Sequence, residues 1–337
     1  MKKWIRGTLI LVLIMSILSL VGCSTSTTTD TNNSKAANEK QKIIGILQIV
    51  EHPSLDAARQ GFIDALKANG YEDGKQVKLD YQNAQGQVQN LTTISQKFVN
   101  DKVDMIFAIA TPSAQAAAQQ TKDIPILITA VTDPVTAGVV KSMDKPGTNV
   151  TGTTDMNPVK DQLALVKEVK PSAKKVGIIY NTGEANSEVQ IKIAKEVAPE
   201  LGLNLELVGI TNSSEVKQAA DALAAKVDAI YVPTDNTVVS ALDSVLMVAE
   251  QTKIPVVVGE GDSVKKGGLI TYGLDYYKLG YQTGEMAVKV LKGEAKPQDM
   301  PIETQKDMKL IVNKKAAKRM GVELSEELLK KADEVIE

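Results

Sequence analysis

Residues 102–113 read Lys-Val-Asp-Met-Ile-Phe-Ala-Ile-Ala-Thr-Pro-Ser, and residues 226–236 follow the same plan as Lys-Val-Asp-Ala-Ile-Tyr-Val-Pro-Thr-Asp-Asn. Each stretch opens with Lys-Val-Asp, continues through apolar residues and stops at a polar turn. An Ala- or Val-rich segment follows in both halves, and then a Thr-Lys pair and an Ile-Pro pair, at 121–125 and 252–255. Chance similarity between ordinary α/β segments is the alternative, and the shared order of these pairs argues against it.

This repeated unit predicts a particular fold class. A continuous apolar run bounded by turn residues is typical of a strand buried on both faces, as in a parallel sheet. The alternation of such strands with helical segments over both halves predicts an α/β protein with two doubly wound parallel-sheet lobes. Ligands of open α/β sheets bind at the carboxyl ends of the strands, where the polar turns stand. We therefore expect a ligand cleft between the two lobes.

The length of 337 residues suits two domains. We expect lobe 1 to contain 43–153 plus about 274–303, and lobe 2 to contain about 154–273 plus 304–337. Several short crossings between the lobes would form a multi-strand hinge that opens and closes on a ligand.

Composition excludes several function classes. Beyond residues 1–22 the chain carries 36 basic and 41 acidic residues, so no basic excess indicates nucleic acid as a partner. One Cys and one His leave little material for a metal site or a nucleophile–base pair. No Gly-rich nucleotide fingerprint and no Gly-x-Ser-x-Gly elbow is present. We expect no enzymatic activity, no metal and no cofactor.

The first 42 residues have the composition of a leader and a linker. A basic start, an apolar segment and a small residue before Cys23 predict a signal peptide over residues 1–22. The arrangement resembles the bacterial lipobox, which implies that Cys23 is acylated and becomes the first mature residue. A plain secretion signal or an uncleaved membrane anchor is the alternative. The Ser/Thr/Asn-rich residues 23–42 cannot bury apolar surface and are expected to be a flexible tether.

Seven short motifs together resemble one family. They are found at 83–86, 108–113, 132–134, 150–153, 180–186, 232–236 and 272–277. As a set they resemble the ABC-transporter substrate-binding lipoproteins of the tryptophan/tyrosine type, which have a type I periplasmic-binding-protein fold.

The resemblance implies a lipid-anchored receptor on the extracytoplasmic face of a bacterial membrane. Such a receptor captures a small zwitterionic ligand, here an aromatic amino acid such as tryptophan, phenylalanine or tyrosine. It delivers the ligand to a membrane permease that an ATPase subunit drives. A receptor for a branched amino acid, a sugar or a nucleoside remains an alternative, as does a non-transport sensor of the same fold.

A zwitterionic ligand sets requirements that few residues meet. Arginine is the usual bidentate partner of a carboxylate, but Arg59 is expected inside a helix. We therefore assign the carboxylate to Thr111 and Ser113 at a helix start, where simple capping is the alternative role. Asp235 is the first choice for the ammonium because it comes from the opposite lobe, and capping is again the alternative.

A ring would need an apolar or stacking surface, and His52 could stack on it or donate to it. His52 as an ordinary loop histidine is the alternative, and Tyr276 and Tyr277 could serve the ring or the core. The remaining candidates stand at strand ends or crossings: Asn83, Thr132, Asp133, Asn181, Glu184, Thr234, Asn236, Glu260 and Asp275.

Overall fold

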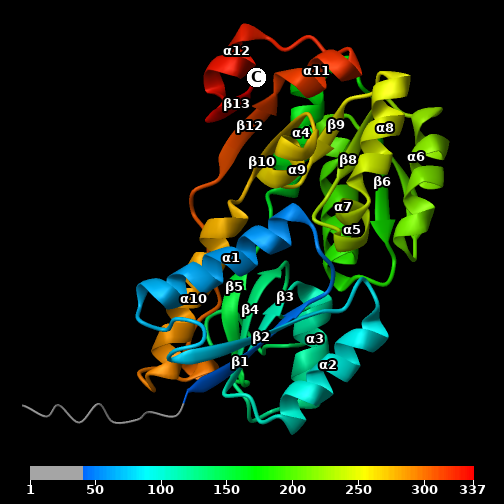
Figure 1. Ribbon diagram of the computed structural model, residues 1–337. Coiled ribbons are helices and arrows are strands. Elements are labelled where there is room, and N and C mark those ends of the chain that lie inside the picture. Colours follow the sequence, from blue (N-terminus) through cyan, green and yellow to red (C-terminus); the bar gives the residue numbers. More distant parts are fainter. Residues whose placement is uncertain (1–40) are drawn as a thin grey trace, which may run out of the picture. The chain divides into compact units, whose positions relative to one another are not determined.

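The computed structural model describes residues 41–337 (Figure 1). The predicted signal peptide, Cys23 and all but the last two residues of the predicted tether lie outside the described residues. Within 41–337, every helix is too short or too polar to cross a bilayer.

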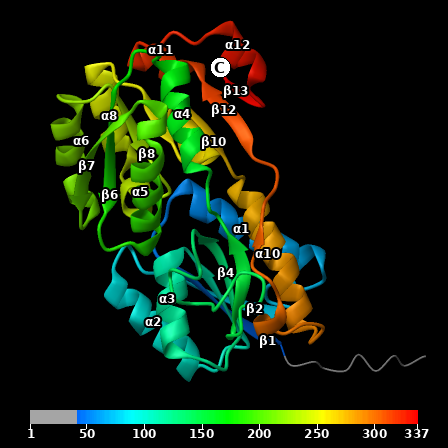
Figure 2. The same ribbon diagram turned by 180° about the vertical axis from the view of Figure 1, so that it is seen from behind.

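The first lobe is built on a six-stranded sheet whose strand pairs are all parallel. Its strands in spatial order are β11 (Glu303–Thr304), β5 (Val150–Thr154), β4 (Ile126–Val131), β3 (Met105–Ile109), β1 (Lys42–Gln48) and β2 (Val77–Asn83). Its helices are α1 (Pro53–Ala68), α2 (Val88–Asn100), α3 (Thr111–Gln120) and α10 (Tyr276–Leu291), with a short 3-10 turn η3 (Pro297–Asp299). Helix α1 packs on α10, and α2 packs on α3 (Figures 1 and 2).

The second lobe is built on a seven-stranded sheet that is parallel except where β10 meets β12. Its strands in order are β13 (Glu334–Ile336), β12 (Lys309–Asn313), β10 (Ile270–Gly273), β9 (Val256–Val258), β8 (Ala229–Val232), β6 (Lys175–Asn181) and β7 (Asn204–Ile210). Its helices are α4 (Val159–Val169), α5 (Ala185–Val197), η1 (Pro199–Leu201), η2 (Ser213–Glu215), α6 (Val216–Ala224), α7 (Asn236–Ser240), α8 (Leu242–Thr252), α9 (Gly261–Lys266), α11 (Lys314–Met320) and α12 (Glu326–Lys331).

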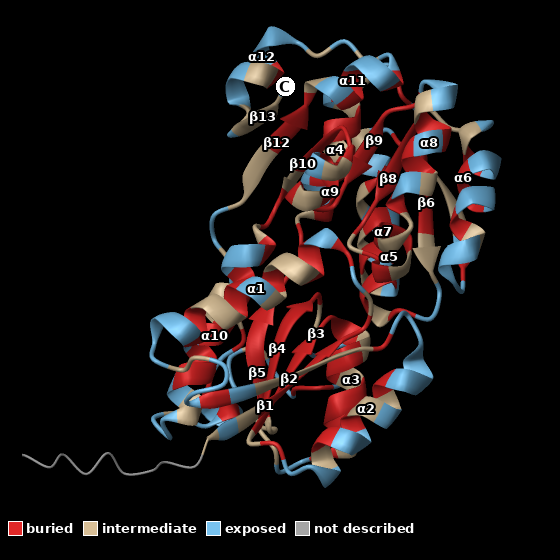
Figure 3. Cartoon of the chain, viewed as in Figure 1, coloured by how far each residue is buried: buried red, intermediate tan, exposed pale blue. Residues whose placement is uncertain are grey.

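The two sheets confirm the predicted fold class. The repeated stretches form equivalent parts of the two sheets, β3 leading into α3 and β8 leading into α7, and every residue of both strands is buried (Figure 3). Each sheet has its own apolar core on its strands and helices. The chain passes from one sheet's elements to the other's at 155–158, 274–275 and 305–308.

Two helix starts differ from the expectation. Ser54 is a fair N-cap by its residue type and predicts a helix that begins at residue 55, but Pro53 is the first residue of α1 and His52 is the N-cap. Proline has the backbone angle that the first helical position requires, so it fixes the start two residues earlier than a cap at Ser54 would. Helix α3 begins at Thr111 rather than after it, with Ala110 as the N-cap at a φ of 79°.

Two further helices show where sequence patterns were insufficient. The sequence of residues 237–251 predicts one continuous helix, but the helix is interrupted at Ala241, which separates α7 from α8. Helix α9 was not predicted, because its six residues are too few to show a helical period.

Glycines bring α1 and α10 into direct backbone contact. A Cβ atom on Gly280 would lie 1.8 Å from the carbonyl oxygen of Ala58, and one on Gly61 would lie 2.0 Å from that of Tyr277. Any side chain at these positions would collide with main-chain atoms. The two helices therefore approach as closely as their backbones allow, and residues near the start of each reach the cavity described below.

Candidate functional site

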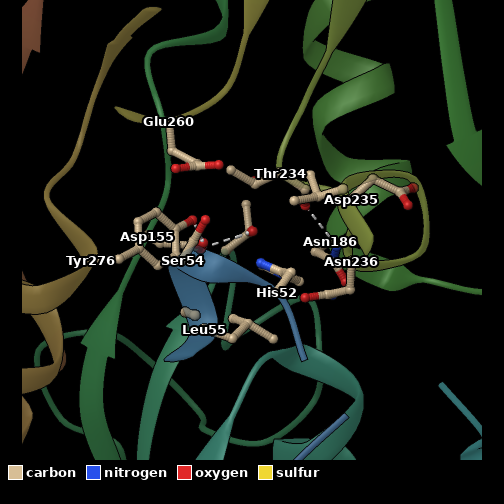
Figure 4. A pocket seen from close by; sticks show the side chains of 13 residues that line it. His52, Ser54, Leu55, Asp155, Asn186, Thr234, Asp235, Asn236, Glu260 and Tyr276 are labelled. Carbon is tan, nitrogen blue, oxygen red and sulfur yellow. Dashed lines mark hydrogen bonds between the residues drawn. The ribbon is translucent and has the colours of Figure 1, made fainter. Parts of the chain in front are cut away.

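A small cavity lies where the two lobes meet (Figure 4). Lobe 1 and the first crossing contribute His52, Ser54, Leu55, Ala130, Thr132, Asp155 and Tyr276, and lobe 2 contributes Asn186, Thr234, Asp235, Asn236, Val239 and Glu260. Both lobes therefore supply polar groups to a single pocket.

Several polar atoms of this lining have no hydrogen-bond partner. Both ring nitrogens of His52, Oγ of Ser54 and Oδ1 of Asn186 are buried without one, and they make up half of the eight such side-chain atoms in the described part of the chain. Buried polar groups are almost always paired, because an unpaired one costs free energy. Their concentration here marks the place where a polar ligand would complete the bonding.

Asp155 gives the cavity an acidic side. Its carboxylate accepts a hydrogen bond from Oγ1 of Thr132 at 3.0 Å and another from the hydroxyl of Tyr276. Burial raises the pKa of Asp155, and the two hydrogen bonds oppose this effect. Each carboxylate oxygen has one donor and keeps lone pairs for another.

Glu260 lies on the same side of the cavity in Figure 4. It is the N-cap of α9 and accepts hydrogen bonds from the backbone N–H groups of Asp262 and Ser263. Burial raises the pKa of Glu260, and the neighbouring Asp262 charge adds to that rise. Two carboxyl groups with raised pKa values in one cavity favour a cationic ligand group.

The start of α1 offers hydrogen-bond donors. No side chain caps this 16-residue helix, although Ser54 and Leu55 in its first turn line the cavity. The first N–H groups of a helix have no partner within the helix and carry its positive dipole end. Together with the unpaired hydroxyl of Ser54, they form a site suited to an anion.

His52 is a neutral imidazole at ordinary pH. Burial lowers its pKa to about 4, the Asn236 side chain acts in the opposite direction, and the charge of Lys266 lowers the pKa further. An uncharged imidazole has one nitrogen that donates and one that accepts.

Glu184 lies behind the lobe 2 wall and orients it. Its Oε2 accepts from Nδ2 of Asn186 at 3.0 Å, from Nδ2 of Asn236 at 2.6 Å and from the Asn236 backbone N–H at 3.1 Å. Its Oε1 accepts from the backbone N–H and hydroxyl of Thr237. Both pocket amides are thereby held by one carboxylate.

Asp235 is engaged within its own lobe. Its carboxylate accepts from Asn181 N and Ser187 Oγ, both at 2.6 Å, and from Val238 N at 2.8 Å, which makes it the N-cap of α7. Burial raises its pKa to about 7, and the charge of Glu184 adds to the effect. With three donors already bound, this carboxylate is less suited than Asp155 to hold an ammonium.

The structure brings six of the predicted site residues to the cavity: His52, Thr132, Thr234, Asp235, Asn236 and Glu260. It places seven outside the lining: Asn83, Thr111, Ser113, Asp133, Asn181, Glu184 and Asp275.

Local structure accounts for several of these seven positions. Asn83 and Asp133 accept from nearby backbone N–H groups in turns, and Asp275 is the N-cap of α10. Thr111 and Ser113 are buried at the start of α3 with unpaired hydroxyls, but they do not line the cavity.

Sequence reasoning did not select Ser54, Leu55, Ala130, Asp155, Asn186 or Val239 as site residues, and it left Tyr276 between a role at the ligand ring and one in the core. The sequence could have indicated Asp155 as a site residue, because it directly follows β5, after which the chain passes to lobe 2. The apolar lining residues could not have been identified from the sequence, since a Leu or Val facing a cavity has the same sequence pattern as one facing the core.

The chain belongs to the family of ABC transporter substrate-binding proteins, whose family model matches residues 43–336. It is 47% identical over 317 residues to a tyrosine-binding protein of Clostridioides difficile, a match that covers 94% of this chain and 92% of that protein. It is the substrate-binding component of an ABC transporter and not an enzyme, as the sequence predicted.

Two solved structures bear on the arrangement of the lobes. An L-Trp complex from Streptococcus pneumoniae is 39% identical, with a TM-score of 0.84 over 88% of this chain and 100% of that one. A ligand-free, open substrate-binding protein with adhesive properties from Clostridium difficile is 50% identical, with a TM-score of 0.65 over 88% of this chain and 99% of that one. The backbone thus matches the ligand-bound relative better, although the open one is closer in sequence.

Proposed function

We propose that this protein captures one aromatic amino acid, tryptophan or tyrosine, in the cavity between its lobes and delivers it to a membrane permease. The observation that carries the proposal is the set of unpaired buried polar atoms of His52, Ser54 and Asn186 around one cavity that both lobes line. The tyrosine-binding and L-Trp-bound relatives support the ligand class. Binding by both lobes favours the closed state, because a ligand shifts an equilibrium only through differential contacts.

The ligand's ammonium is assigned to the acidic side of the cavity. Asp155 has free acceptor capacity there, and Glu260 adds a second carboxyl group. A cation between them relieves the electrostatic cost that burial imposes on both.

The ligand's carboxylate is assigned to the first turn of α1. The hydroxyl of Ser54 and the first-turn N–H groups supply donors without an arginine. This differs from the initial assignment to Thr111 and Ser113, which lie outside the lining. Leu55, Ala130 and Val239 supply apolar surface for the ring.

We further propose that Cys23 carries a lipid anchor that keeps the protein on the extracytoplasmic face of the membrane. The support is the basic start, apolar segment and Gly22-Cys23 junction. Labelled palmitate should be incorporated into the wild type and not into Cys23→Ala. Equal labelling of both would contradict the anchor.

The ligand assignment is tested by calorimetry and thermal unfolding of residues 41–337, which form one compact unit with residue 40. Tryptophan or tyrosine should bind saturably and raise Tm, while glucose and adenosine should not. The chain's one Trp, Trp4, lies outside this segment, so the fluorescence of added tryptophan provides an independent readout. Binding of glucose or adenosine without binding of either amino acid would overturn the proposal.

A further inference from the structure

The Asn186 amide has a fixed orientation. Its Nδ2 donates to Glu184 Oε2 at 3.0 Å and to the backbone oxygen of Thr234 at 3.0 Å, and it lies 3.3 Å from Ser187 Oγ. A carboxylate and a carbonyl can only accept, so the nitrogen must face them. The amide oxygen is therefore left on the other side, where it is buried without a partner in a residue that is 3% exposed.

Asn236 is oriented by the same carboxylate. Its Nδ2 donates to Glu184 Oε2 at 2.6 Å, which turns its oxygen away from Glu184. In Figure 4 the Asn236 side chain extends toward His52. The lobe 2 wall of the cavity thus presents amide oxygens, and the N–H groups of both amides are used behind it.

We propose that Asn186 and Asn236 select a ligand side chain that carries a hydrogen-bond donor, and that Glu184 is the positioning residue that turns both amide oxygens into the cavity. An indole N–H or a phenol O–H can donate to this wall, whereas a phenyl ring leaves the buried Asn186 oxygen unpaired. The site therefore discriminates against phenylalanine. This inference rests on the proposed function, since it concerns the ring of the same ligand.

The two sides of the cavity suit different parts of the ligand. Asp155, Tyr276 and Glu260 lie on one side of His52 in Figure 4, and Asn186 and Asn236 lie on the other. The ammonium has two carboxyl groups on the first side, so the amide oxygens remain available to the side chain. A site built to bond a donor rejects an analogue that lacks it, because its own polar group is then left unsatisfied.

The first test needs no mutation. Calorimetry compares L-tryptophan with L-3-benzothienylalanine, in which sulfur replaces the indole N–H with little change of shape, and L-tyrosine with L-phenylalanine. We expect each ligand without the donor to bind at least tenfold more weakly than its partner. Equal affinities within both pairs would overturn the inference, and the proposed function would stand. Failure of all four to bind would overturn the proposed function as well.

Variants then assign the roles of the residues. Asn186→Leu keeps a similar volume but removes the oxygen, so the affinity ratio of tryptophan to benzothienylalanine should fall severalfold toward one. In Glu184→Gln, an N–H₂ group replaces a carboxylate oxygen that accepts hydrogen bonds from Asn186 and Asn236. One of these two amides must then rotate to present its oxygen to the new donor, which should also reduce the affinity ratio. Glu188→Gln, an exposed change on the same helix, should leave the ratio unchanged.

The ratio separates positioning from a merely structural role. Loss of structural support would weaken both ligands equally, whereas a turned amide weakens only the ligand with the donor. A folded Glu184→Gln protein with the wild-type ratio would overturn the role of Glu184, and a folded Asn186→Leu protein with that ratio would overturn the role of Asn186. Thermal unfolding establishes folding, and if either variant does not fold, the wild-type ligand pairs decide.

Discussion

The hydroxyl of Tyr276 donates a hydrogen bond to the carboxylate of Asp155, and the two residues follow different passages of the chain between the sheets. Asp155 begins the passage after β5, and Tyr276 follows the passage after β10. The carboxyl group proposed to hold the ligand is thus bonded to a residue beside a second crossing. A ligand at Asp155 would act on both passages at once, which suits a protein that closes on its ligand.

Replacing Asp155 by Asn should weaken tryptophan or tyrosine binding by about 100-fold or more, because the ammonium loses its charged partner at a buried site. The unliganded protein should unfold at the wild-type temperature or above it. Burial raises the pKa of this carboxyl group, so its charge opposes folding, and the hydroxyls of Thr132 and Tyr276 can bond an amide. Calorimetry and thermal unfolding measure the two effects. Asp133→Asn, in a turn outside the cavity, serves as the matched control; unchanged affinity in Asp155→Asn would remove the residue from the ammonium site.

Replacing Asp235 by Ala should destabilise the protein by about 2–4 kcal/mol in urea unfolding. The reason is that the buried donors Asn181 N, Ser187 Oγ and Val238 N lose their shared acceptor. Ligand binding should weaken too, since Asn236 follows directly in the chain. Unaltered stability together with abolished binding would return Asp235 to the ammonium role expected from the sequence.

Replacing Gly280 by Ala should destabilise lobe 1 by about 3 kcal/mol or more, because the new Cβ atom would lie 1.8 Å from a carbonyl oxygen of α1. Urea unfolding measures the loss. Glu285→Ala at an exposed position of the same helix should change stability by no more than about 0.5 kcal/mol. Equal stability of the two variants would show that the helices can separate at low cost.

His52 is the only histidine of the chain, so its ring signals can be followed by NMR without assignment. Burial should delay its protonation until about pH 4. Below pH 6.5 the unfolded chain takes up a proton that the folded chain does not, so stability should be lost as the pH falls from 6.5 to about 4, by about 3 kcal/mol from this group. A midpoint near 6.5 would contradict its burial. The protonation of Asp235 should change the stability in the opposite direction over an overlapping pH range. Its carboxyl pKa is raised in the folded state, which favours the folded state as the pH falls.

Much of the fold follows from local patterns. The runs at 102–113 and 226–236 are apolar because β3 and β8 are buried on both faces, and that property can be read without knowing the partner strands. Short elements such as α9 could not be predicted, because six residues are too few to establish a period.

The candidate site was less predictable, because roles depend on contacts between distant segments. Residues chosen for their place at strand ends, such as Thr132 and Asn236, line the cavity. The sequence could not show that Asn181 and Ser187 already donate hydrogen bonds to the carboxylate of Asp235. Nor could it show that the carboxylate of Asp155 keeps free lone pairs. The ligand roles of all these residues stay predictions until binding is measured.

The contact between α1 and α10 limits how the ligand range of this protein can change. Because main-chain atoms meet at Gly61 and Gly280, neither helix can shift outward to admit a bulkier compound without breaking that contact. Natural or laboratory selection for new ligands should therefore act first on the side chains contributed by lobe 2, where a substitution alters chemistry and leaves the backbone in place.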